Sequence, residues 1–211
     1  SLLAYLTLPA GDAVAIMGGS GGSAVVFSDA ADRYGIRYSV LAPATHEVLN
    51  KVLPAMASLE NPIDYAAGFI TDANTPRFRA AVDAVLADPA VDQLGVLFAT
   101  TTGEQARNGA TVLAEAVTRH AKPVFTFLSV PRETTGGGMD ILEKAGIPAI
   151  PVITDAFTAT AAEMAGLWGV PDFRYVMIPH PLATLTPSAI DERVDALIGR
   201  VLELLKSGQP Q

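Results

Sequence analysis

Short apolar runs alternate along the chain with longer segments in which apolar side chains recur every three or four residues. The runs are as long as buried strands, and the longer segments have the spacing of one helical face. This pattern predicts strands at residues 13–17, 37–41, 94–99, 122–127 and 147–150. It predicts helices that begin near residues 22, 43, 76, 103, 138 and 154, with Gly35 as the C-cap of the first and Gly136-Gly137-Gly138 at the start of the fifth.

The order of these elements indicates the fold class. Strands that alternate with helices through short links form a parallel sheet covered by helices on both faces. The sequence therefore predicts an α/β fold over residues 1–168, a flavodoxin-like, doubly wound domain with a five-stranded parallel sheet. The regular alternation of strands and helices ends after residue 168. Residues 174–178 are predicted as an added strand, and Thr186-Pro187 caps a final amphipathic helix. Residues 169–211 are therefore expected to form a C-terminal extension.

A stretch of glycine and serine, Gly18-Gly19-Ser20-Gly21-Gly22-Ser23, joins the first predicted strand to the first helix. Bare N–H groups and hydroxyls at a helix start are suited to an anion. Residues 19–24 also fit the dinucleotide fingerprint G-x-G-x-x-A, which needs an acidic residue at the end of the second strand. That strand ends Val40-Leu41-Ala42-Pro43, so we do not expect NAD. The alternative is that the glycines only allow the strand and the helix to pack closely.

A second hydroxyl-rich helix start, Thr100-Thr101-Thr102-Gly103, follows the strand predicted at residues 94–99. Loops at the carboxyl ends of neighbouring strands flank the crevice in which open α/β sheets bind ligands. Two such helix starts that face one spot would hold an anion through their dipoles and open N–H groups. Ordinary N-capping by threonine is the alternative for each of these residues.

Composition narrows the function classes. The net charge is −8, which argues against a nucleic-acid surface, since that would need clustered Lys and Arg. There is no cysteine, and His46, His120 and His180 lack metal-ligand spacing, so no metal site is expected. No apolar run approaches the roughly 20 residues of a membrane span, and no signal peptide is visible. We therefore expect a cytoplasmic protein without a membrane partner.

Candidates for proton transfer are weak. No Ser-His-Asp order or pair of carboxylates typical of an active site occurs, so no catalytic residue is assigned. His180 lies between two prolines in the extension, where a structural or surface role is expected. Asp64 and Asp72 lie in a loop, and each is more typical of a turn residue than of an acid or base.

Several phrases in a fixed order resemble acyl-CoA synthetases of the NDP-forming type, which are relatives of succinyl-CoA ligase. The resemblance covers roughly residues 10–168. Its phrases include Val14-Ala15-Ile16-Met17 with the glycine loop, Asn61-Pro62-Ile63-Asp64, Asp88-Pro89-Ala90-Val91-Asp92, Lys122-Pro123-Val124 and Ala145-Gly146-Ile147-Pro148. The part resembled is the flavodoxin-like ligase domain, and not the CoA-binding Rossmann domain or the ATP-grasp domains.

In this family, such a domain aims a helix start at a phosphohistidine carried by a neighbouring domain. The resemblance therefore implies a phosphohistidine-facing site made of Gly19, Ser20, Gly21, Gly22, Ser23, Asn61, Asp64, Thr100, Thr101, Thr102 and Gly103. It implies CoA-binding and ATP-grasp domains or subunits as partners. CoA and ATP, or another nucleoside triphosphate, with Mg would serve the full enzyme, and this domain itself would bind no cofactor.

No histidine lies where the family carries the phosphate, so the isolated domain is expected to be inactive in ligation. The alternative function is a non-catalytic binding module derived from this fold, which would form a homodimer through the final helix.

Overall fold

The computed structural model describes residues 8–98, 101–128, 132–147, 152–167 and 175–207. It divides into two compact units, the larger formed by residues 7–149 and the smaller by residues 150–211 together with residues 1–6. The candidate site was predicted wholly within the larger unit.

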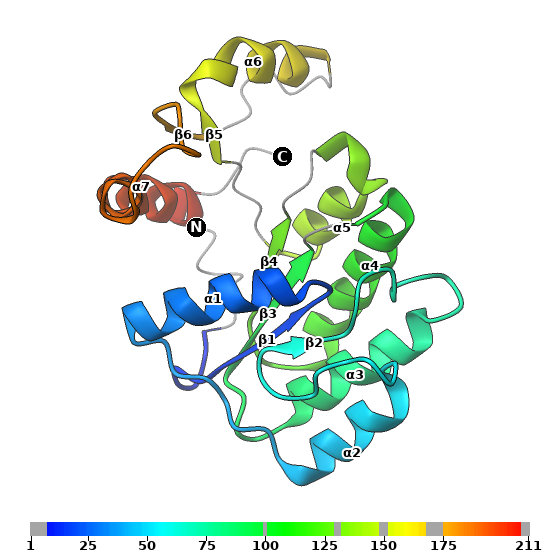
Figure 1. The fold of residues 1–211 in the computed structure, drawn as a ribbon. Coiled ribbons are helices and arrows are strands. Elements are labelled where there is room, and N and C mark those ends of the chain that lie inside the picture. Colours follow the sequence, from blue (N-terminus) through cyan, green and yellow to red (C-terminus); the bar gives the residue numbers. More distant parts are fainter. Residues whose placement is uncertain (1–7, 99–100, 129–131, 148–151, 168–174, 208–211) are drawn as a thin grey trace. The chain divides into compact units, whose positions relative to one another are not determined.

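The larger unit is an α/β domain built on one parallel sheet (Figure 1). In chain order its elements are β1 (Val14–Gly18), α1 (Gly21–Tyr34), α2 (Pro43–Val52), β2 (Ile63–Asp64), α3 (Thr75–Ala87), β3 (Gln93–Phe98), α4 (Gly103–Arg119), β4 (Val124–Leu128), the 3-10 turn η2 (Arg132–Thr135) and α5 (Gly138–Lys144). The strand order is β2-β1-β3-β4, and all neighbouring strands are parallel. The predicted α/β class is confirmed, but the sheet has four strands among the described residues instead of five.

Two predicted strands account for the difference. Residues 37–41 contribute only an isolated bridge to β1, because the chain then turns away into α2. That turn is fixed by the buried Asp88, whose carboxylate accepts hydrogen bonds from the Ala42 N–H (2.7 Å) and the Thr45 hydroxyl (2.6 Å). The rest of this edge of β1 is taken by β2, a two-residue strand that the pattern did not predict. Of the last predicted strand, residues 148–150 lie outside the described residues.

Local signals place the helix ends well. α1 ends at Gly35, whose φ of 65° lies in the left-handed region, so the predicted C-cap is confirmed. α2 and α3 each carry a proline in the first turn, where its missing N–H has no helical partner to lose. The helices predicted near residues 103 and 138 begin at those residues.

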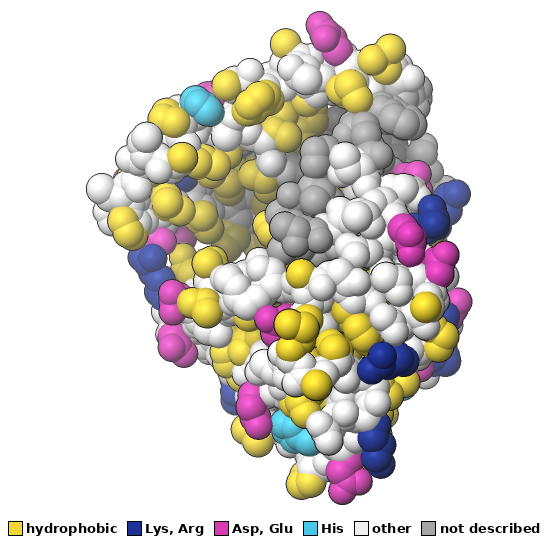
Figure 2. All heavy atoms as spheres, turned by 45° about the vertical axis from the view of Figure 1, so that its right-hand side comes forward, with side chains coloured by type: hydrophobic (Ala, Val, Ile, Leu, Met, Phe, Trp, Pro, Cys, Tyr) yellow, Lys and Arg dark blue, Asp and Glu magenta, His cyan; other side chains and the backbone are white. Residues whose placement is uncertain are grey.

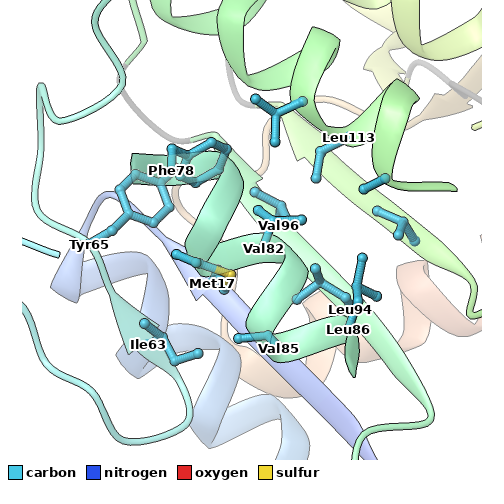
Figure 3. Close-up of a cluster of buried hydrophobic side chains, with 14 of the residues drawn as sticks. Met17, Ile63, Tyr65, Phe78, Val82, Val85, Leu86, Leu94, Val96 and Leu113 are labelled. Atoms are coloured by element: carbon cyan, nitrogen blue, oxygen red, sulfur yellow. The ribbon is translucent and has the colours of Figure 1, made fainter. Parts of the chain in front are cut away.

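Alternate side chains of β1 point to opposite faces of the sheet. Ala15 and Met17 join a large apolar cluster with side chains of α2, α3, α4 and α5 (Figure 3). Val14 and Ile16 join a smaller cluster with Phe27 of α1 on the other face. Side chains of β1, β3 and α4 pack in the large cluster. This packing fixes the carboxyl ends of the two strands and the start of α4 at one edge of the sheet.

The smaller unit contains β5 (Val152–Thr154), the 3-10 turn η3 (Asp155–Phe157), α6 (Thr158–Leu167), β6 (Val176–Ile178) and α7 (Pro187–Ser207). β5 and β6 pair in parallel, and α7 packs on β6. The predicted extension strand and final helix are confirmed, whereas the helix predicted from residue 154 begins four residues later, after η3. The domain boundary at residue 168 stays a prediction.

Charged side chains of both signs share the surface. On the face drawn in Figure 2, Lys and Arg side chains lie among Asp and Glu side chains instead of forming one basic patch. None of the helices in the described ranges combines the length and the apolar character needed to cross a bilayer.

Candidate functional site

The carboxyl ends of β1, β2 and β3 lead into the segments that were predicted to face an anion. A cavity of about 10 Å³ lies here, lined by Gly19, by residues 65 and 67–70, and by Thr101 and Gln105. Its volume is enough for about one water molecule. The structure therefore brings Gly19 of the first predicted loop and Thr101 of the second to one place, whereas Thr100 lies outside the described residues.

The start of α1 is capped by its own serine. Ser20 is the N-cap residue, and its hydroxyl accepts a hydrogen bond from the Ser23 N–H (3.4 Å). The N–H groups of Gly21-Gly22 lie in the first turn and have no acceptor within the helix. Gly19 packs against Tyr65, since a Cβ on Gly19 would lie 2.8 Å from that ring. Close packing therefore explains Gly19, and Gly21-Gly22 carry the N–H groups that an anion could reach.

The start of α4 is built in the same way. Thr102 and Gln105 form a capping box, in which the Thr102 hydroxyl accepts the Gln105 N–H and the Gln105 side chain accepts the Thr102 N–H. The N–H groups of Gly103-Glu104 again have no acceptor within the helix. Thr101 Oγ1 is buried and has no hydrogen-bond partner in the described part of the chain. The capping box thus accounts for a threonine at position 102, but it gives no role to the buried hydroxyl of Thr101.

A glycine turn supports the α4 start from outside. A Cβ on Gly136 would lie 2.5 Å from the Gly103 carbonyl oxygen, and Gly136 also has a φ of 57°. A Cβ on Gly103 would in turn lie 3.2 Å from the Thr134 carbonyl oxygen. The sequence pattern predicts Gly136-Gly137-Gly138 only as a helix start, whereas the structure shows that the turn also contacts the backbone at the start of α4.

The Asn61 side chain forms hydrogen bonds with the backbone at the edge of the sheet. Its Oδ1 accepts a hydrogen bond from the Ile16 N–H (2.9 Å), and its Nδ2 donates to the carbonyls of Val14 (2.8 Å) and Ser39 (3.0 Å). Both amide hydrogens therefore have backbone acceptors. Along this edge of β1, Val14 pairs with Tyr38 and Met17 pairs with Ile63 of β2. The Asn61 side chain bonds to the backbone of β1 between these two pairings.

Asp64 ends β2 and lies over the start of α1. Its Oδ1 accepts the Ala66 N–H (2.9 Å), and a Cβ on Gly21 would lie 3.2 Å from its Oδ2. Burial, with a smaller effect of the Asp64 charge, raises the pKa of Tyr65 far above its usual range. The Tyr65 phenol stays neutral and donates to the Leu97 carbonyl (3.4 Å), so it offers no acid or base at neutral pH.

The histidines lie elsewhere. His120 contacts the Asp83 carboxylate (2.9 Å) where α4 ends, beside α3. In the smaller unit, the His180 N–H donates to the Asp155 carboxylate (2.9 Å), and Arg193 donates to the carbonyls on both sides of His180. His, Cys, Asp and Glu side chains in the described ranges form no group that could hold a metal ion.

The parallel sheet, with two hydroxyl-capped helix starts at its carboxyl edge, defines the larger unit as a flavodoxin-like α/β domain. A family model described as the Ligase-CoA domain matches residues 14–163, and the chain belongs to this family. A second model, described as the UGSC family, matches residues 140–207, which include all of the described smaller unit.

Two of the relatives are named as a CoA ligase or an acetyl-coenzyme A synthetase, as the resemblance indicated. The alpha subunit of ADP-forming acetate–CoA ligase II from Pyrococcus furiosus is 32% identical over 146 residues, or 67% of this chain and 31% of that protein. The crystal structure of PH0766 from Pyrococcus horikoshii OT3 matches with a TM-score of 0.61 and 30% identity, covering 70% of this chain and 34% of that one.

A third relative is the dinucleotide forming acetyl-coenzyme A synthetase 1 of Ca. Korarchaeum cryptofilum. Its apo form matches with a TM-score of 0.59 and 26% identity, over 71% of this chain and 32% of that one. The same protein has been solved in complex with phosphate and ADP. The chain spans about a third of the length of each of these relatives.

Proposed function

We propose that this chain supplies the ligase domain of an NDP-forming acyl-CoA synthetase, in which a helix start receives a phosphoryl group carried on a histidine of a neighbouring domain. The observation that carries the proposal is the pairing of two capped helix starts at one edge of the sheet. Gly19 and Thr101, which precede these starts, line the same cavity, and Thr101 Oγ1 has no partner there among the described residues.

The chemistry suits such a site because it needs no titratable group from this chain. A phosphoryl group is an anion, and the positive end of a helix dipole with open N–H groups stabilises it at any physiological pH. Gly103-Glu104 of α4 supply the open groups, and the Thr101 hydroxyl can donate a further hydrogen bond. This domain would stabilise the negative charge of the phosphoryl group, while the partner domains make and break the bonds.

The remaining components belong to the assembled enzyme. CoA-binding and ATP-grasp domains or subunits would act as partners, with CoA, ATP or another nucleoside triphosphate, and Mg. The overall reaction would join a carboxylic acid to CoA, or run in reverse, in the cytoplasm. The isolated chain would be inactive.

A pair of variants at one position tests the role of α4. Glu104→Pro removes an open N–H at a first-turn position where proline is tolerated, and Glu104→Ala removes the same side chain but keeps the N–H. In the assembled enzyme, we expect Glu104→Pro to lower the rate of acyl-CoA formation by about tenfold or more relative to Glu104→Ala, since a preorganised donor to a developing charge is lost. Equal rates for the two variants would overturn the proposal.

A second candidate is a module that dimerises through α7. It is favoured by the apolar face of that helix, on which the side chains of Ile198 and Leu202 are 54% and 47% exposed. If the chain dimerises through this face, Leu202→Glu converts the dimer to monomers in light scattering. A wild-type chain that is monomeric at all concentrations would rule this candidate out.

A further inference from the structure

A second cavity of the larger unit lies at the amino edge of the sheet, opposite the candidate site. Its volume is about 450 Å³, and it is lined by β1, β3, β4, α1 and the segment that follows α1. Val14 and Gln93, which line it, are the first residues of β1 and β3. Sites for small molecules have volumes of about 300–1,000 Å³. The cavity is therefore large enough for a small organic molecule.

The walls of this cavity are mostly apolar. They include the side chains of Val14, Phe27, Ile36 and Phe125. Ile36 and Phe125 are each 38% exposed, so part of their apolar surface is open to solvent. Covering such surface with an apolar group is favourable, and the faces of phenyl rings also attract cations.

The charged groups at the cavity carry more negative than positive charge. Asp12 and Arg37 line it, and Arg37 Nε donates a hydrogen bond to Asp12 Oδ1 (2.7 Å). Arg37 also lies 3.6 Å from the Asp92 carboxylate, so one guanidinium faces two carboxylates. The hydrogen bond from Arg37 and its charge hold the pKa of Asp12 below its usual range, so Asp12 stays ionised at neutral pH.

The end of α1 adds negative potential at the same place. Gly35 and Ile36 line the cavity, and their N–H groups donate to one carbonyl of the last turn. The carbonyls of residues 32–34 have no donor within the helix, and the negative end of its dipole favours a cation. Arg33, the basic residue of this turn, lies over the Tyr34 ring and does not line the cavity.

We propose that this cavity binds a small organic cation, an amine with an apolar or aromatic body. The body covers the apolar walls, and the ammonium group lies near Asp12 and the end of α1. An anion of the same shape would have to displace Asp12 from Arg37. The length of β1 separates this site from the carboxyl edge by roughly 13 Å, and the proposal does not depend on the function proposed for that edge.

Two probes of nearly the same shape and opposite charge test the site. The isotope-labelled chain is titrated with 2-phenylethylamine and, separately, with 3-phenylpropionate, and amide chemical shifts are followed. We expect the amine to shift the amides of Gly35, Ile36 and Gln93, and the carboxylate to bind there at least about fivefold more weakly, because one charge contact in water gives about this factor. Equal affinities at these amides, or no shift with the amine, would overturn the proposal.

Two variants with opposite expected effects separate charge from shape. Asp12→Asn removes a carboxylate and should weaken binding of the amine about fivefold, whereas Arg37→Gln removes the competing cation and should strengthen binding by a similar factor. Glu47→Gln is the matched control, because it removes an exposed carboxylate from α2, which packs on the other face of the sheet. Its affinity should equal that of the wild type. Changes in the same direction for Asp12→Asn and Arg37→Gln would overturn the preference for a cation.

A cavity-filling variant tests the location of the site. Ile36→Trp places a larger side chain in the cavity, at a position that is already partly exposed. With its fold checked by circular dichroism, this variant should lose most of its affinity for 2-phenylethylamine. Affinity equal to that of the wild type would place the amine elsewhere and overturn the proposal.

Discussion

Replacing Asn61 by alanine removes the carboxamide that joins three backbone segments at the edge of β1. The Ile16 N–H then loses its acceptor, and the carbonyls of Val14 and Ser39 each lose a donor. Ile16 is fully buried, and Val14 and Ser39 are nearly so, so water cannot easily replace the lost groups.

The expected cost follows from these contacts. Three hydrogen bonds at about 1 kcal/mol each give a loss of about 3 kcal/mol in the free energy of unfolding. The buried Ile16 N–H without an acceptor adds about 1 kcal/mol more. Asn61→Asp keeps the acceptor for Ile16 but turns a second oxygen toward the two carbonyls, so it should be destabilising by a similar amount.

Urea unfolding followed by far-UV circular dichroism measures the loss, and hydrogen exchange at the Ile16 amide reports it locally. Asn74→Ala is the matched control, because the Asn74 side chain makes one exposed hydrogen bond to Arg77 and no cap bond to α3. Its cost should stay below about 0.5 kcal/mol. A loss below about 1 kcal/mol for Asn61→Ala, with normal exchange at Ile16, would refute the reasoning.

Three further outcomes concern the supports of the site. Thr102→Ala should cost about 1 kcal/mol by removing the α4 cap, and Thr102→Ser should restore it in the same unfolding assay. Gly136→Ala should cost about 3 kcal/mol because its Cβ meets backbone in a left-handed conformation, against about 1 kcal/mol for Gly137→Ala, which meets nothing within 4 Å. Burial raises the pKa of Asp88, but the hydrogen bonds that it accepts outweigh this and hold the pKa below its usual range. Its contribution to stability is therefore complete above about pH 5 and lost as the pH falls through the aspartate range, and Asp88→Asn should flatten this decline.

Local patterns in the sequence were enough to predict the bounds of elements that depend on neighbouring residues. The run at 13–17 and the glycine loop after it gave β1 and α1 to within one residue, and Gly35 marked the end of α1. The meeting of Gly19 and Thr101 also followed, because parallel strands in one sheet bring their carboxyl ends to one edge.

What could not be predicted depends on contacts that are distant in sequence. Residues 37–41 have the composition of a strand, yet a carboxylate more than 40 positions away turns the chain into α2. β2 has two residues, which is too short for any periodic signal. Asn61 was expected to face an anion, and the structure shows that its amide hydrogens go to carbonyls 22 and 47 positions away. The anion-facing role of the site residues stays a prediction.

The phrase Asn61-Pro62-Ile63-Asp64 therefore holds two side chains whose contacts differ in number and in reach. Asn61 bonds to three backbone groups at the edge of the sheet, whereas the Asp64 side chain accepts the N–H of Ala66, two residues away. Asp64→Asn keeps an acceptor for that N–H, so it should lower the free energy of unfolding by much less than Asn61→Ala does in the same urea assay. Equal losses for the two variants would show that the segment acts as one support and that the contacts of Asn61 have no special weight.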